Sequence, residues 1–379
     1  MRESGQSLPR AAEFDAEAGA REAAPSERVA PQAAIAQHLT DAASQAWPPF
    51  VLVSGLLLLG VVAHAEGLFD RASAALNSVP GPPAVLLGAS LTLVAATTAV
   101  LNLDTAVVFL TPVLVLAARR RNAPEQPFLY GAVFMANASS LYLPGSNLTN
   151  LLVLAREPVA GGSLLVPGAA ASAVCGLGVW LLHRTELRAP PERVATRASA
   201  AGSGIGFGAA GALVAAAATL LLKSPAPWVL LVGAAAAAAA VARQKLSGRE
   251  AFRAIGPLVL LALFLASVAL GGLARALSFS PLTHAGRPAT AALGAAASVL
   301  VNNLPAAVLL SAHRVAHPRA LLFGLNLGPN LAVSGSLSAY LWWKAARQVK
   351  ARPSVAAFTR SGVAIAPATI IAALLLSRG

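Results

Sequence analysis

The chain has 379 residues, of which 56% are hydrophobic and only 11% are charged. This composition lies outside the range of water-soluble domains and indicates that lipid is the main solvent of the protein. The net charge of +13 could indicate nucleic-acid binding, but the basic residues form short clusters between apolar runs, so we expect none. The one cysteine, Cys175, excludes a disulfide within the chain, and the histidine spacing predicts neither a metal site nor a cofactor.

Residues 1–47 differ in composition from the rest of the chain. They are rich in alanine, glutamine and serine and carry more acidic than basic side chains. This pattern predicts a disordered, acidic, Ala-rich N-terminal tail. Because no basic stretch followed by an apolar stretch is present there, we expect the tail to be retained and not cleaved as a signal peptide.

Apolar runs that are long enough to cross a bilayer as helices follow the tail. Two of the runs, 84–118 and 289–312, are interrupted near their middle and are predicted to be re-entrant hairpins. The fold class is therefore an all-α polytopic membrane protein with about eight crossings, of which 128–155 and 320–343 are interrupted helices, and two re-entrant hairpins. In chain order the predicted crossings are 48–65, 128–155, 164–183, 204–222, 226–242, 255–274, 320–343 and 361–376.

The two halves of the chain repeat one another. Residues 131–137 (GAVFMAN) match residues 324–330 (GLNLGPN), and Asn102 and Asn302 match at the two hairpin tips. Tracing the crossings puts the open ends of the hairpins on opposite sides, so the repeats are inverted, and the loops rich in lysine and arginine then face the cytoplasm. We predict a first transport repeat at 48–183, a cytoplasmic loop at 184–203, linking scaffold helices at 204–242 and a second inverted repeat at 255–376.

Inverted repeats with interrupted apolar segments are typical of secondary transporters, because unwound backbone at membrane depth persists only where it is buried or lines a cavity. No pattern of a nucleophile with a base, or of metal ligands, predicts an enzyme. Asp104 is an acidic residue inside an apolar hairpin, where an ionised carboxylate is unfavourable unless it is paired or hydrated. We predict that Asp104 binds the driving proton. The alternative is that it only caps the second hairpin helix through the amides of Ala106 and Val107.

The other polar residues of the interruptions are neutral. Amides and hydroxyls suit a small polar solute or a desolvated Na⁺, while the N-termini of the half-helices suit an anion. For any one of these residues, the alternative is a contact that only satisfies backbone or a neighbouring helix. The predicted solute- or ion-binding residues are Asn102, Thr105, Asn137, Ser146, Asn147, Thr149, Asn150, Asn302, Asn303, Asn326, Asn330, Ser334 and Ser336.

These motifs resemble those of a known family. Residues 101–112 (LNLDTAVVFLTP) and 136–150 (ANASSLYLPGSNLTN) are similar to the first signature of arsenite-efflux permeases of the ArsB type, within the ion-transporter superfamily. Residues 300–307 (LVNNLPAA) and 324–341 (GLNLGPNLAVSGSLSAYL) are similar to the second signature. The resemblance runs from about Phe50 to the C-terminus.

The resemblance implies a secondary transporter of the cell inner membrane that exports arsenite or antimonite, as the neutral trihydroxide, in exchange for protons. It also allows a soluble ATPase subunit and a second copy of the chain, in a homodimer, as partners. Membrane lipid is the other expected partner. A Na⁺/H⁺ antiporter or a small-anion permease of the same superfamily is the alternative. The sequence departs from the family in lacking two scaffold helices before the first hairpin. It also has Asn137 and Asn326 where aspartate is expected, and Asn330 where lysine is expected, which leaves proton coupling to Asp104 alone.

Overall fold

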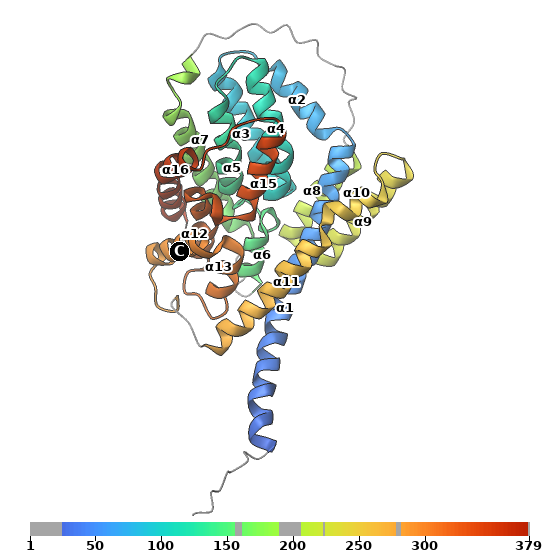
Figure 1. Ribbon diagram of the computed structural model, residues 1–379, viewed down its shortest axis with the longest axis vertical. Coiled ribbons are helices and arrows are strands. Elements are labelled where there is room, and N and C mark those ends of the chain that lie inside the picture. The colour runs from blue at the N-terminus through green and yellow to red at the C-terminus, as the bar shows by residue number, and fades with distance from the viewer. Residues whose placement is uncertain (1–24, 156–160, 189–205, 223, 278–281, 378–379) are drawn as a thin grey trace, which may run out of the picture.

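The computed structural model in Figure 1 describes residues 25–155, 161–188, 206–222, 224–277 and 282–377, and the regular structure of these residues is helical. The first repeat contains two short 3₁₀ turns, η1 (Pro144–Ser146) and η2 (Gly161–Leu164), and seven α-helices. These helices are α1 (Pro25–Ala65), α2 (Leu68–Ser78), α3 (Pro83–Val100), α4 (Leu103–Arg120), α5 (Glu125–Ser139), α6 (Leu148–Leu154) and α7 (Leu165–Leu182).

The second half follows a helical linker. The turn η3 (Glu186–Arg188) precedes the linker helices α8 (Phe207–Leu221), α9 (Ala226–Ala242) and α10 (Gly248–Ile255). The second repeat contains α11 (Pro257–Ala276), α12 (Arg287–Val301), α13 (Asn303–Leu310), α14 (Pro318–Leu327), η4 (Gly328–Leu331), η5 (Val333–Gly335), α15 (Leu337–Gln348) and α16 (Val355–Leu376).

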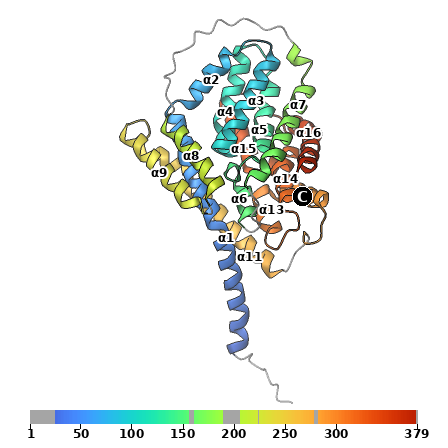
Figure 2. The same cartoon turned by 180° about the vertical axis from the view of Figure 1, so that it is seen from behind.

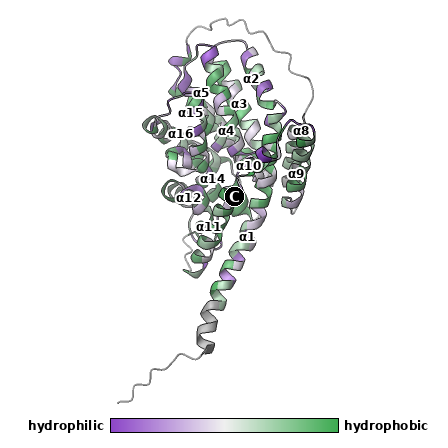
Figure 3. Ribbon diagram, turned by 45° about the vertical axis from the view of Figure 1, so that its right-hand side comes forward, coloured by the Kyte–Doolittle hydropathy of each residue, from purple (hydrophilic) through white to green (hydrophobic). Residues whose placement is uncertain are grey.

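Five helical segments of the described chain are long and apolar enough to cross a membrane: Ala33–Ala65, Pro83–Val100, Gly162–Leu182, Gly248–Ala276 and Val355–Leu376. Four of them contain predicted crossings, and the segment Pro83–Val100 is the first arm of the first hairpin. The crossings at 128–155 and 320–343 are predicted as interrupted helices, and the structure divides them into α5, η1 and α6 and into α14, η4, η5 and α15, respectively. Figure 3 shows that hydrophobic residues predominate along the helices, as expected for a multi-pass membrane protein.

The first re-entrant hairpin consists of α3 and α4, which meet at Leu101 and Asn102. Its two open ends lie together, because the guanidinium of Arg121 after α4 donates hydrogen bonds to the carbonyl oxygens of Val79 and Gly81 before α3, at 2.7 and 2.8 Å. The chain therefore returns to the side from which it entered. Each arm has 18 residues and is about 27 Å long.

The second hairpin consists of α12 and α13, which meet at Asn302. Its open ends also lie together, since the amide of Ala316 donates to the carbonyl oxygen of Leu282 at 3.2 Å. This hairpin is shorter, with arms of 15 and 8 residues. Both hairpins thus have the re-entrant form that the interrupted apolar runs predict.

Helix α16, with 22 residues and a length of about 33 Å, shows that the repeats are inverted. At its start, the amide of Ser354 donates to the hydroxyl of Tyr130 in α5 at 2.9 Å, close to the open end of the first hairpin. At its other end, Arg287 at the start of the second hairpin donates to the carbonyl oxygens of Leu374 and Ser377. The open ends of the two hairpins therefore lie at opposite ends of the bundle.

Helix α1 packs against α8, α9 and α11 and forms with them a scaffold beside the two repeats, as Figures 1 and 2 show. Two glycines allow the closest approach: a Cβ atom on Gly55 of α1 would lie 2.5 Å from the carbonyl oxygen of Val229 in α9, and one on Gly233 of α9 would contact the backbone of Gly55. Small residues at such positions let membrane helices pack backbone against backbone.

The predicted disordered tail at 1–47 is wrong for residues 25–47, which belong to α1. Their alanine-rich sequence favours helix, and burial of Ala42, Gln45 and Ala46 adds tertiary packing that composition alone does not reveal. Residues 1–24, and residues 189–203 of the predicted cytoplasmic loop, lie outside the described residues. Helices α2 and α10 occupy segments for which no element was predicted.

The close contact of α1 with α9 predicts that Gly55→Ala destabilises the fold. The added Cβ would force the helices apart, at a cost of about 1–3 kcal/mol. Gly88→Ala in α3 is the matched control, because a Cβ there has nothing within 4 Å. We expect a lower melting temperature for Gly55→Ala and an unchanged or higher one for Gly88→Ala in detergent; equal melting temperatures would contradict the packing.

Candidate functional site

The first interrupted helix breaks between α5 and α6, and side chains replace its missing backbone hydrogen bonds. The Oδ1 atom of Asn147 accepts from the amide of Thr149 at 3.1 Å and so caps α6. The Nδ2 atom of Asn150 donates to the carbonyl oxygen of Ser140, the residue that ends α5, at 2.7 Å. All four residues are buried, so these contacts satisfy backbone groups that water does not reach.

Asn326 of α14 joins this break to the second repeat. Its Oδ1 atom accepts from the Ser140 hydroxyl at 2.8 Å and from Nδ2 of Asn147 at 2.7 Å. Its Nδ2 atom donates to Oδ1 of Asn150 at 2.7 Å and to the carbonyl oxygen of Leu322 at 2.8 Å. The side chain is fully buried and uses both donor hydrogens and both acceptor positions. Asn326 is therefore the centre of a buried polar network that links the repeats.

Asn137 and Asn330 extend the contact between the repeats. The Nδ2 atom of Asn137 donates to Oδ1 of Asn330 at 2.7 Å, and both side chains are buried. The two residues occupy the same position in the matched segments 131–137 and 324–330. Equivalent residues of two related halves contact each other only near the axis that relates the halves. This pair therefore marks the pseudo-twofold axis between the repeats.

Asp104 contacts the second repeat through the other break. Ser336 caps α15 by accepting from the amide of Ala339, and the hydroxyl of Ser338, the second residue of the helix, donates to Oδ1 of Asp104 at 2.6 Å. The cap of α4 is Asn102, whose Oδ1 accepts from the amide of Thr105 at 2.7 Å. The interpretation of Asp104 as the helix cap is therefore wrong. No ion pair of Asp104 is present in the described part of the chain.

The two hairpin tips are equivalent in position but differ in hydrogen bonding. Asn302 has φ 75° and ψ 150°, a backbone conformation that residues other than glycine rarely adopt, and its Nδ2 donates to the carbonyl oxygen of Ser334 at 3.3 Å. Asn102 is extended, with φ −178° and ψ 172°, and its buried Nδ2 has no hydrogen-bond partner within the described structure. The side-chain NH₂ group of Asn102 is thus left without a partner in the described residues, whereas that of Asn302 is hydrogen-bonded within the protein.

The remaining predicted residues lie around the same tips and breaks. The hydroxyl of Ser146 donates to the carbonyl oxygen of Ala99, near the end of the first arm of the first hairpin. The hydroxyl of Ser334 donates to the carbonyl oxygen of Val299, near the end of the first arm of the second hairpin. The hydroxyl of Thr149 is buried and has no partner in the described residues, while Thr105 packs against Gly60 of α1 and Asn303 is buried. The predicted site residues are therefore brought to the hairpin tips and breaks.

Sequence reasoning missed Ser140 and Ser338, which supply contacts between the repeats. Ser140 follows Asn137 in the quoted motif, and Ser338 follows Ser336 in the other. The position of each serine within its motif could therefore have identified it as a site residue.

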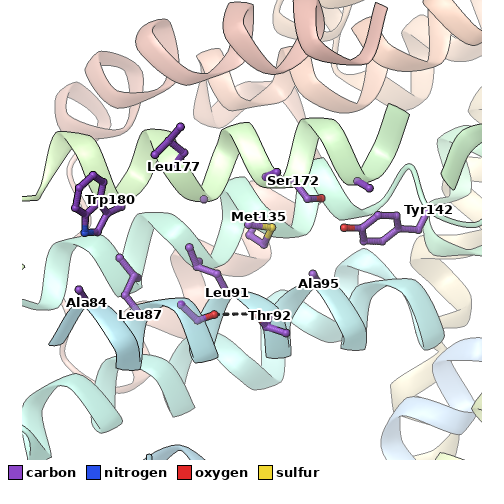
Figure 4. A pocket seen from close by; sticks show the side chains of 14 residues that line it. Ala84, Leu87, Leu91, Thr92, Ala95, Met135, Tyr142, Ser172, Leu177 and Trp180 are labelled. Carbon is purple, nitrogen blue, oxygen red and sulfur yellow. Dashed lines mark hydrogen bonds between the residues drawn. The ribbon is translucent and has the colours of Figure 1, made fainter. Parts of the chain in front are cut away.

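A separate cavity of about 540 Å³ lies between α3, α5 and α7 (Figure 4). Its lining includes Leu91 of α3, Met135 of α5 and Trp180 of α7, and it is mainly apolar. None of the predicted site residues lines it. This cavity is therefore distinct from the polar network.

Among the described residues, the polar network contains no basic side chain: the hydrogen-bond partners of Asn326, Asn150 and Asp104 are amides, hydroxyls and backbone carbonyls. Among the described residues, no group of three or more histidine, cysteine, aspartate or glutamate side chains could hold a metal ion. The arrangement can bind a small solute by hydrogen bonds and can exchange one proton at Asp104.

Two inverted repeats whose hairpin tips and helix breaks carry buried polar side chains define a secondary transporter. The chain belongs to the citrate transporter family, whose model matches residues 25–334. Membership of this family makes the chain a multi-pass membrane transporter and not an enzyme. This family is part of the ion-transporter superfamily, so the match supports the superfamily and does not test the narrower arsenite-efflux assignment.

Among solved structures, the chain is similar to the YdaH transporter of Alcanivorax borkumensis, which is described as having an unusual topology. The TM-score is 0.57 at 15% identity, over 93% of this chain and 88% of that one. At this identity the likeness shows the fold alone, and the all-helical transporter fold is thereby confirmed. No curated protein matches the chain.

The network around Asn326 predicts that Asn326→Ala is strongly destabilising. It would leave polar atoms of Ser140, Asn147 and Asn150 buried without this partner, and each such atom costs about 1–3 kcal/mol. The control is Ser90→Ala, since the buried Ser90 hydroxyl has no partner in the described structure. We expect the melting temperature to fall by more than about 5 °C in the first variant only. A similar melting temperature in both variants would show that the network does not hold the repeats together.

Proposed function

We propose that this transporter exports arsenite or antimonite across the cell inner membrane in exchange for protons. The observation that carries the proposal is the chemistry of the tips and breaks: their side chains are neutral amides and hydroxyls apart from one carboxylate, Asp104, which has no basic partner among the described residues. A neutral trihydroxide offers hydrogen-bond donors and acceptors in all directions. It therefore suits an amide-lined site that lacks fixed positive charge.

Asn102 and Thr149 are the first solute contacts in this proposal. Both carry buried polar atoms without a partner among the described residues, and a buried unpaired donor is costly. Asn147 and Asn302, although predicted as binding residues, use their amide groups in contacts within the protein. A hydrogen bond from Nδ2 of Asn102 to a solute oxygen would satisfy the orphaned donor.

Asp104 and Ser338 provide the proton coupling in this proposal. An ionised Asp104 accepts the hydroxyl hydrogen of Ser338, which ties the tip of the first hairpin to the break in the second repeat. Protonation removes the negative charge and thus weakens this charge-assisted bond. The proton therefore changes the contact between two elements that must move during alternating access.

A carboxylate anion such as citrate is the second candidate substrate. Two observations favour it: the family is that of citrate transporters, and four helices begin at the tips and breaks, namely α4, α6, α13 and α15. Helix N-termini carry partial positive charge and free amide hydrogens, which suit an anion. A Na⁺/H⁺ antiporter is a further alternative, because amide and hydroxyl oxygens also bind Na⁺.

Transport into everted membrane vesicles under an imposed proton gradient distinguishes these substrates. We expect accumulation of arsenite and antimonite that collapses when the proton gradient is abolished. Citrate and Na⁺ serve as the parallel substrates, and vesicles without the protein serve as the control. Accumulation of citrate or Na⁺ in place of arsenite would overturn the substrate assignment and leave the transporter class intact.

Asp104→Asn is expected to uncouple transport. The variant keeps an oxygen that can accept from Ser338 but cannot bind and release a proton, so gradient-driven accumulation should fall to the level of passive equilibration. Glu66→Gln is the matched control, because Glu66 lies in the scaffold, where it accepts from the amide of Gly208 at 2.8 Å. Both variants are compared at equal expression with the substrate that the wild type accumulates. Normal accumulation by Asp104→Asn would exclude Asp104 as the coupling residue.

A further inference from the structure

The end of the bundle that carries the open end of the first hairpin also holds a basic pocket of about 420 Å³. The pocket lies in the connection from α15 to α16. Its lining residues are Trp343, Arg347, Lys350, Ala351, Arg352 and Pro353. The cationic side chains are exposed, Trp343 is half-buried and Ala351 is buried. The pocket thus combines an apolar wall with a rim of three positive charges.

The backbone of this connection is shaped to gather the charges. Lys350 has φ 59°, a left-handed conformation that ends α15, and its amide donates to the carbonyl oxygen of Arg347 at 3.0 Å. The next turn bond runs from the amide of Ala351 to the carbonyl oxygen of Ala346. This tight turn brings residues 347, 350 and 352 around one opening, although a lysine in this conformation is less favourable than glycine.

The basic rim has no acidic partner. The described structure contains two ion pairs, Arg119 with Glu125 and His183 with Glu186, and neither involves a residue of the pocket. Glu125 is already occupied by Arg119, which also donates to the carbonyl oxygen of Val349 and so fixes the turn. The three charges of the pocket are therefore available to an anion from outside the chain.

The position of the pocket indicates which anion. The membrane-spanning helix Val355–Leu376 begins two residues after Pro353, so the pocket lies at the level where this helix leaves the hydrocarbon core. Tryptophan is enriched at this level, and basic pockets there bind the headgroups of anionic lipids. The apolar wall formed by Trp343, Ala351 and Pro353 offers a surface for the glycerol and upper acyl region, which a free phosphate ion lacks.

We propose that this pocket binds the phosphate headgroup of an anionic membrane lipid. The phosphate oxygens lie against Arg347, Lys350 and Arg352, and the ring of Trp343 packs against the lipid backbone. The site is separate from the polar network between the repeats and does not depend on which solute is transported. It attaches the turn between α15 and α16 to the membrane surface.

Native mass spectrometry of the purified full chain tests the proposal, with phosphatidylglycerol and phosphatidylcholine of identical acyl chains added in equal amounts. We expect the wild type to retain phosphatidylglycerol preferentially. In the triple variant Arg347→Gln/Lys350→Gln/Arg352→Gln, the preference for phosphatidylglycerol should fall at least about tenfold. The reason is that each basic residue near an anionic surface strengthens binding about fivefold. The matched control Lys245→Gln/Arg249→Gln/Arg253→Gln removes three exposed charges near α10 and should keep it.

Two further measurements complete the test. The single variant Arg352→Glu should weaken retention as well, and melting temperatures in phosphatidylcholine alone should match the wild type for all variants, which separates lost binding from misfolding. Unchanged retention in both pocket variants would overturn the proposal. Displacement of the lipid by millimolar inorganic phosphate would also overturn it, because the pocket would then be a site for the free ion.

Discussion

The structure depends on one constraint of the bilayer, namely that every backbone polar group must find its partner within the protein. Four interruptions expose such groups, two at hairpin tips and two in broken helices. Each is closed by one side chain that accepts from a backbone amide of the following helix: Asn102 for α4, Asn147 for α6, Asn302 for α13 and Ser336 for α15. The first role of these polar residues is therefore structural: they supply the hydrogen bonds that the interrupted backbone lacks.

The two repeats use the same kinds of hydrogen bond at their hairpins but differ at the hairpin tips. A loop serine holds the end of the first arm in both hairpins, through Ser146 and Ser334. The tip of the first hairpin departs from this symmetry, because it carries Asp104 where the second carries Leu304 and because the side-chain nitrogen of Asn102 has no partner among the described residues. The two tips are therefore not chemically equivalent.

At the hairpin tips and helix breaks, the links between the repeats are neutral apart from the contact at Asp104. Asn326 connects the break in the first repeat to the second repeat with three hydrogen bonds, and the pair of Asn137 and Asn330 marks the pseudo-twofold axis. Amide groups do not titrate, so this network keeps the same strength at any physiological pH. The contact between Asp104 and Ser338 contains a carboxylate and responds to protonation. The contacts that cannot titrate and the one contact that can are therefore separate.

The sequence by itself determined the membrane class, the positions of both hairpins and the inverted repetition, because long apolar runs and their polar interruptions are local signals. It also located Asp104. Only the tertiary structure decided what each polar residue contacts: that Asn102 and not Asp104 caps α4, that Asn147 is occupied by Asn326, and that residues 25–47 extend α1. These outcomes depend on Ser338, 234 positions from Asp104, on Asn326, 179 positions from Asn147, and on the burial of Ala42 and Ala46, none of which a local pattern encodes.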